Sequence, residues 1–260
     1  EKLDADYILL DLGSGTALNV IDFFLLSNSG IVIATPQTPA VLNAYNFLKN
    51  VVFRHLQRLE GSKAVTDYLK KVVKEQQPGA TPTISSIVKG IKEIDAEGGR
   101  RAAQELAQLR PQMVVNMADA PSDLDLIDNF RELVSRNLEV QLGSLGLVYQ
   151  DSAVRRSLKN LNPVTVNNAD SVVTREIDRI AQKILQSPRF PTMPLDYSEY
   201  SDSFELTRIE AENDYADVSG EQEQGELGVS NEEFLSIIAM QKKQIEELRG
   251  TVRMLTMNQR

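Results

Sequence analysis

Continuous apolar runs alternate with segments of helical periodicity over the first 190 residues. The runs predict strands at residues 7–12, 30–35, 112–117 and 145–149. The helical patterns that follow them predict helices at 17–26, 39–59, 121–138 and 151–158, and a last one at 171–186. All runs but the last are apolar throughout, which is typical of parallel strands that helices cover on both faces. The alternation therefore predicts an α/β fold with a mostly parallel sheet flanked by helices.

A polar helical stretch at about 61–109 separates the second predicted helix from the third strand. Its periodicity is interrupted by Pro78-Gly79 and by Gly98-Gly99, which we expect to break the helices. The pattern predicts an inserted helical hairpin or lid; alternatively, the stretch is a solvated addition without a function of its own. Residues 1–190 would then form one domain that contains this insertion.

The chain beyond residue 190 has a different character. Residues 195–230 contain eleven acidic side chains against one basic side chain, Arg208, and few aliphatic residues. Such a segment buries too little apolar surface to offset the entropy lost on ordering, so residues 191–230 are expected to be a disordered acidic linker. From Ser230, which stands three residues before Glu233 as in a capping box, apolar residues recur at spacings of four and three. This heptad pattern predicts a coiled-coil helix at 231–260.

The last predicted helix has two interpretations. A regular apolar seam favours pairing with a second copy of the chain or with a protein partner. A membrane-surface anchor is the alternative, because Arg249, Arg253 and Arg260 flank apolar residues near the end of the chain. Glu246 and Glu247, together with the absence of Trp and Phe near the end, favour pairing.

Composition and charge exclude several classes of chemistry. The chain has no Cys and one His, His55, which excludes thiol catalysis, disulfides and Cys/His zinc sites. Residues 195–230 carry a net charge of −10 out of the total of −9, so the rest of the chain is close to +1 and shows no preference for nucleic acid. No segment approaches the roughly 18 uninterrupted apolar residues that a membrane span needs. We therefore expect a cytoplasmic protein without direct nucleic-acid binding, peripheral at the membrane if the last helix is an anchor.

The motif Asp11-Leu-Gly-Ser-Gly-Thr16 places a carboxylate and two glycines at the end of the first predicted strand. Open α/β sheets bind ligands at this end of their strands. A hydrolase would need Gly-x-Ser-x-Gly around Ser14, and this spacing fails. The motif also resembles the first motif of S-adenosylmethionine-dependent methyltransferases. The next strand, however, ends at 33–38 without the acid that would hold the ribose hydroxyls. A methyltransferase stays open as an alternative.

Phosphoryl transfer is the third chemistry that the motif fits. A strand that ends in Asp can hold Mg²⁺ through water, and the glycine N–H groups after it can respond to a γ-phosphate. Three later segments support this interpretation by their order and spacing: IVIATPQTPAVLNAY at 31–45, VVNM at 114–117 and VYQDSAVR at 148–155. Together with the opening motif, they resemble the MinD/ParA group of deviant-Walker P-loop ATPases, and within it the FlhG-like flagellar regulators. The resemblance runs over residues 4–185.

The resemblance implies ATP and Mg²⁺ as cofactors and a set of catalytic residues. Asp11 would act at the magnesium ion through water and would form the catalytic switch with Gly13 and Gly15. As an alternative, Asp11 and Gly13 only end a strand and form a turn.

The resemblance also implies cofactor-binding residues. Asn116 and Pro36 would lie near the adenine, with Gln37 where the family usually has Glu. Asp151 would border the nucleotide pocket together with Val154 and Arg155. Each has a structural alternative: Asn116 as a loop cap, Pro36 as a strand terminator and Asp151 as the N-cap of the helix that follows.

One element of the family is missing from the sequence. No Gly-x-x-x-x-Gly-Lys-[Ser/Thr] loop occurs in the 260 residues, and residue 1 is Glu instead of Met. We therefore expect an N-terminally truncated chain with an incomplete P-loop NTPase fold. The implied function is a nucleotide-dependent switch in cellular positioning or regulation, which acts as a homodimer and recruits a protein partner through its last helix. A non-catalytic scaffold that works through its coiled coil is the rival interpretation.

Overall fold

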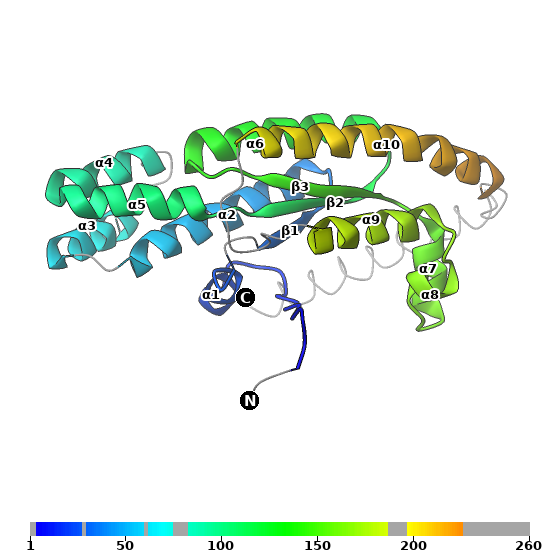
Figure 1. Cartoon of the computed structure of the whole chain (residues 1–260), viewed down its shortest axis with the longest axis horizontal. Helices are drawn as coiled ribbons and strands as arrows, with labels where there is room; N and C mark the ends of the chain where they lie inside the picture. Colours follow the sequence, from blue (N-terminus) through cyan, green and yellow to red (C-terminus); the bar gives the residue numbers. More distant parts are fainter. Residues whose placement is uncertain (1–3, 28–29, 60–61, 75–82, 187–196, 226–260) are drawn as a thin grey trace, which may run out of the picture. The chain divides into compact units, whose positions relative to one another are not determined.

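Three parallel strands form the sheet in the part of the chain that the structure describes (Figure 1). The computed structural model describes residues 4–27, 30–59, 62–74, 83–186 and 197–225, and it divides the chain into two units, 1–215 and 216–260. The account below concerns the first unit. The strands are β1 (Ile31–Ala34), β2 (Gln112–Ala118) and β3 (Gly143–Tyr149), in the spatial order β1-β2-β3. The predicted α/β fold, with a parallel sheet flanked by helices, is confirmed at this level.

Helices connect and cover the strands. Their bounds are α1 Leu18–Phe24, α2 Thr38–Arg58, α3 Lys63–Lys74, α4 Ile84–Ile94, α5 Ala96–Gln108, α6 Leu124–Leu138, α7 Ser152–Lys159, α8 Val164–Asn167, α9 Val172–Gln186 and α10 Tyr197–Gly225, with a 3₁₀ turn η1 at Pro121–Asp123. On one face of the sheet, Val173 and Ile180 of α9 pack against Val114 and Leu145. Side chains of the opposite face, such as Val115, are also buried, and α2 and α6 lie on that side (Figure 1). The apolar runs of β2 and β3 therefore reflect a sheet covered on both faces, whereas Ile33 of β1 is 65% exposed.

The first predicted strand is not formed. Residues 7–12 have no strand partner, and Leu9 is 86% exposed. A strand needs a hydrogen-bonded neighbour. β1 pairs only with β2, and no other strand of the described residues lies on its outer edge. The strand prediction for residues 7–12 is therefore wrong for this structure, because an apolar run does not supply its own partner.

The stretch at 61–109 forms α3, α4 and α5, and its glycine pair does not break a helix as expected. Gly98 and Gly99 lie in the first turn of α5, whose N-cap Asp95 accepts hydrogen bonds from Glu97 N and Gly98 N, both at 3.1 Å. Gly99 is buried, and a Cβ atom there would lie 2.5 Å from the Cα atom of Lys92 in α4. The absence of a side chain at Gly99 thus permits α4 and α5 to pack closely. Pro78-Gly79 lies outside the described residues.

Substitution of Gly99 tests this close packing. Gly99→Ala should lower the free energy of unfolding by about 1–3 kcal/mol, because the added methyl group meets backbone that has to move. Chemical denaturation monitored by circular dichroism measures the change. Ala103→Val, which adds volume at an exposed position of the same helix, should change stability far less. Equal effects of the two substitutions would contradict the packing role.

The acidic segment is helical where disorder was expected. α10 spans Tyr197–Gly225, so the prediction of a disordered linker at 191–230 is wrong for these residues. Phe204, Thr207, Ala211 and Asp214 are buried and recur at spacings of three and four, which places them on one helix face. Composition alone missed this face because it counts acidic residues as solvated. The predicted coiled coil at 231–260 lies outside the described residues.

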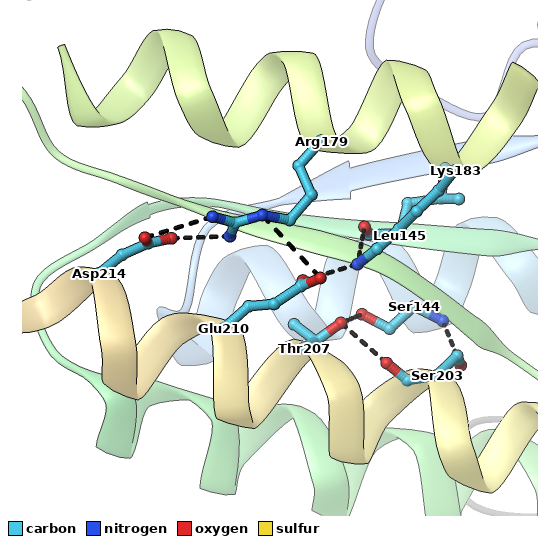
Figure 2. A network of polar contacts seen from close by, with 8 residues as sticks. All are labelled: Ser144, Leu145, Arg179, Lys183, Ser203, Thr207, Glu210 and Asp214. Carbon is cyan, nitrogen blue, oxygen red and sulfur yellow. Dashed lines mark hydrogen bonds and ion pairs between the residues drawn. The ribbon is translucent and has the colours of Figure 1, made fainter. Parts of the chain in front are cut away.

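Ion pairs with α9 account for two of these acidic residues (Figure 2). Asp214 binds the guanidinium group of Arg179, with a shortest N···O distance of 2.7 Å. Glu210 pairs with Lys183 at 2.6 Å, and the Lys183 ammonium group also donates to the carbonyl oxygen of Leu145 at 3.0 Å. The side chains of Asp214 and Glu210 are only 11% and 17% exposed. α9 therefore supplies the cations that allow acidic side chains to be buried.

Side chains also satisfy the outer edge of β3. Ser144 N–H donates to Ser203 Oγ of α10 at 3.1 Å, and the Ser144 hydroxyl lies 2.8 Å from the Thr207 hydroxyl. Figure 2 shows these contacts beside the Lys183 bond to Leu145. At the end of the strand, Tyr149 N–H donates to Glu176 of α9 at 3.1 Å. Serine, lysine and glutamate side chains thus take the place of a further strand.

Removal of one cation tests the contribution of the ion pairs. Arg179→Met should lower the free energy of unfolding by about 2 kcal/mol, because it leaves the buried Asp214 carboxylate without its partner. Arg136→Met is the matched control, since Arg136 pairs with Glu132 on the exposed surface of α6, and it should cost below about 0.5 kcal/mol. Urea denaturation of the two variants measures both values. Equal losses would show that α10 does not depend on this pair.

Candidate functional site

Three of the residues singled out from the sequence lie along one edge of the sheet. Pro36 follows β1, Asn116 stands near the end of β2, and Asp151 follows β3. The strands are parallel neighbours, so their carboxyl ends meet at the same edge. Gln150 N–H donates to the carbonyl oxygen of Ala118 at 2.9 Å, which ties the end of β3 to the end of β2. This is the edge where open α/β sheets bind ligands.

The end of β2 is irregular at Asn116. Asn116 pairs with Val148 and Ala118 pairs with Tyr149, so Met117 is an extra residue in the strand. Met117 has a φ of 59°, a left-handed conformation that costs about 1–2 kcal/mol for a residue with a side chain. Asn116 is half-buried, and in the part of the chain that the structure describes its amide group has no hydrogen-bond partner. A strained bulge beside an available amide is a common feature of binding sites. No pattern in the sequence indicates the left-handed conformation of Met117.

Asp151 is the N-cap of α7. Its Oδ1 accepts a hydrogen bond from Ala153 N at 2.6 Å, which confirms the capping interpretation. Its Oδ2 is buried without a hydrogen-bond partner. Arg155, one turn further on, is exposed. Asp151 thus fixes the start of the helix and retains one free oxygen.

Pro36 has a local structural role. It is half-buried and lies between the end of β1 and Gln37, the N-cap residue of α2. The Gln37 carbonyl oxygen accepts a hydrogen bond from Val41 N at 3.1 Å, while the Gln37 side chain makes no capping bond. Pro36 therefore ends the strand and directs the chain into α2, and the Gln37 side chain is available for other contacts.

The Asp11 loop is not joined to this edge by any hydrogen bond or ion pair between described residues. Asp11 and Gly13 are exposed, and Gly15 has a φ of +117° that favours glycine. The Asp11 carboxylate has no hydrogen-bond or ion-pair partner in the described residues. Over the same residues, no group of three or more His, Cys, Asp or Glu side chains could hold a metal ion directly. The structure places Pro36, Asn116 and Asp151 at the same edge of the sheet, and no bond between described residues connects Asp11 to them.

Glu176 lies beside the candidate site, although the sequence patterns did not single it out. It lies on α9, is 2% exposed, and accepts the Tyr149 N–H bond through Oε2, whereas Oε1 has no partner. Burial raises the pKa of Glu176 to about 8; the Tyr149 N–H group acts in the opposite direction, and Asp214 raises the pKa further. The signal was present in the sequence, because position 176 falls between Val173 and Ile180 on the apolar face of the helix.

Tyr149 links the candidate site to α10. Its hydroxyl group donates to the carbonyl oxygen of Ala211 at 2.6 Å, and its ring centroid lies 6.0 Å from that of Tyr215. Burial raises the pKa of Tyr149 well above its usual value, so the phenol stays protonated and remains a donor. The end of β3 is therefore fixed from α9 through the backbone and from α10 through the side chain.

A comparison with models of known protein families finds no match, and no curated protein matches the sequence. None of the helices of the described residues is long and apolar enough to span a membrane. The candidate residues therefore have to be judged by their own geometry and chemistry.

The raised pKa of Glu176 makes stability depend on pH. Because the pKa rises from 4.5 to about 8 on folding, the stability that protonation gives is complete below about pH 4.5 and is lost as the pH rises through 8. Glu176→Gln stays neutral at every pH. Above pH 8 it should therefore be more stable than the wild type by a few kcal/mol, which is on the order of the free energy of unfolding that corresponds to a pKa shift of this size. Denaturation curves between pH 5 and pH 9 measure this difference.

A matched variant separates this effect from general titration. Glu205→Gln removes a carboxyl group from an exposed position of α10 and should follow the wild-type pH profile. A constant difference in stability between wild type and Glu176→Gln from pH 5 to pH 9 would contradict the buried, neutral state of Glu176.

Proposed function

We propose that these residues form the base-binding and switch side of a MinD/ParA-like ATPase, a nucleotide-dependent switch in cellular positioning or regulation. The observation that carries the proposal is Asn116: an unpartnered amide at a strained bulge, between the strand ends that lead to Pro36 and Asp151. The order of the motifs along the chain and the parallel arrangement of their strands support the same assignment.

The chemistry of the edge suits an adenine base. An asparagine amide presents both a donor and an acceptor, which complement the amino group and a ring nitrogen of adenine. Pro36 and Met117 offer apolar surface beside it, and Met117 is 47% exposed. Sites for small molecules typically combine apolar walls with a few placed polar groups. Asp151 belongs to the same edge and, as the N-cap, fixes where α7 begins.

Asp11, Gly13 and Gly15 form the switch side in this proposal. Asp11 would hold Mg²⁺ through water, and the glycine backbone would adopt one arrangement when a γ-phosphate is present and another after its loss. The bound nucleotide supplies the phosphoanhydride bond and the negative charge that orders this loop. The proposal covers only these two sides of the site, because the sequence has no Gly-Lys loop to hold the phosphates. Homodimerisation and a protein partner at residues 231–260 belong to the same proposal.

Nucleotide binding by the protein tests the proposal. Titration with a fluorescent ATP analogue and Mg²⁺ should give saturable binding, and Asn116→Ala should weaken it about tenfold, because one or two hydrogen bonds to the base are lost. Asp11→Asn should reduce hydrolysis while binding is largely retained. Asn129→Ala, at an exposed position of α6, should change neither quantity.

Two outcomes would overturn the proposal. One is the absence of Mg-ATP binding by the wild-type protein, and the other is binding that Asn116→Ala does not weaken. A parallel titration with S-adenosylmethionine covers the methyltransferase alternative, since saturable binding of that cofactor in place of ATP would assign the edge to it.

A further inference from the structure

Glu176 of α9 binds the backbone at the junction between the end of β3 and the start of α7. Its Oε2 accepts the Tyr149 N–H bond at 3.1 Å. Tyr149 pairs with Ala118 across the sheet, and Gln150 N–H bonds the Ala118 carbonyl oxygen. Two contacts therefore connect Glu176 to the bulge that contains Asn116. The first is its hydrogen bond to Tyr149, and the second is the pairing of the end of β3 with Ala118.

The surroundings of Glu176 disfavour a negative charge. Asp151 faces it from the start of α7, and Asp214 faces it from α10. Two cations of its own helix are engaged by α10: Arg179 by Asp214 at 2.7 Å and Lys183 by Glu210 at 2.6 Å. Arg179 still lowers the pKa of Glu176, but by less than burial raises it. Tyr149 offers only its backbone N–H, since its hydroxyl group bonds Ala211. An ionised Glu176 would thus be a buried charge without a cation of its own.

Two buried carboxyl oxygens at this junction have no donor. They are Oε1 of Glu176 and Oδ2 of Asp151. An ionised Glu176 would place a negative charge in this buried region with one of its oxygens lacking a donor. A neutral Glu176 avoids that charge and keeps its bond to Tyr149. Burial of Glu176 without an ion pair in the described residues therefore favours the protonated carboxyl group at this junction.

We propose that Glu176 is a positioning residue that holds the β3–α7 junction while its carboxyl group is protonated, and that loss of this proton loosens the junction and lowers nucleotide affinity. This inference rests on the proposed function and adds pH regulation to the same site. It assigns no contact between Glu176 and the nucleotide, because the carboxyl group acts through Tyr149 and Asp151.

The test compares wild type, Glu176→Gln and Glu176→Ala at pH 7 and pH 9. The first readout is the hydrogen-exchange protection of the Tyr149 amide, corrected for the intrinsic exchange rate, which needs no nucleotide. The second is the affinity for a fluorescent ATP analogue with Mg²⁺. Glu205→Gln, the exposed carboxyl control on α10, accompanies both measurements.

Wild type and the control should lose Tyr149 protection and about fivefold or more in affinity between pH 7 and pH 9. Glu176→Gln should keep both values at pH 9, because its amide still accepts the Tyr149 N–H bond and never ionises. Glu176→Ala should show low protection and low affinity at both values of pH. Rescue by glutamine but not by alanine separates positioning from a general loss of folding.

The outcomes distinguish the two proposals. If the wild-type protein binds no nucleotide at either pH, the proposed function fails. If it binds nucleotide but Glu176→Gln shows the wild-type pH dependence, the role of Glu176 is overturned and the proposed function stands. A change in Tyr149 protection without a change in affinity would also overturn the role of Glu176 in the site.

Discussion

The structure depends on how the outer edge of β3 is satisfied. An edge strand carries backbone N–H and carbonyl groups that need partners. In β3 these partners are side chains: Ser203 for the N–H of Ser144, Lys183 for the carbonyl oxygen of Leu145, and Glu176 for the N–H of Tyr149. The same contacts hold α9 and α10 against the sheet. The edge of β3 therefore fixes both the fold on this side and the strand end that leads to Asp151.

The polar groups at this edge divide into two kinds. Glu210 and Asp214 of α10 each have a cation from α9, so their charges are compensated although they are largely buried. Glu176 has a backbone donor and no cation of its own, and burial raises its pKa to about 8. Arg179 and Lys183 of α9 are thus committed to α10. The carboxyl group of Glu176 is left neutral around physiological pH, which is where a small environmental change alters its charge.

Sequence patterns predicted what local spacing determines. The βα alternation predicted β1, β2, β3 and their helices, and the alternative role of Asp151 as a cap is confirmed because a cap depends on its own neighbours. The errors concern partners distant in the sequence. Residues 7–12 have strand composition without a neighbouring strand, and α10 is ordered by Arg179 and Lys183 of another helix. The position of Glu176 on the apolar face of its helix was visible in the sequence, but its partner, a backbone N–H group 27 residues away, was not.

The two edges of the sheet explain why the candidate site is ordered on one side only. At β3, side chains from two helices fix the strand end, and Gln150 N–H extends this order to β2, where the left-handed Met117 is held. At β1, the described residues provide no partner for the outer edge, and the Asp11 loop is exposed. A strained residue persists only where its surroundings determine its conformation, and an unpaired loop is free to take more than one. The strand end at Asn116 is therefore fixed by its surroundings, as the proposed base side requires, whereas the exposed loop that contains Asp11 lacks such contacts in the described residues, as the proposed switch requires.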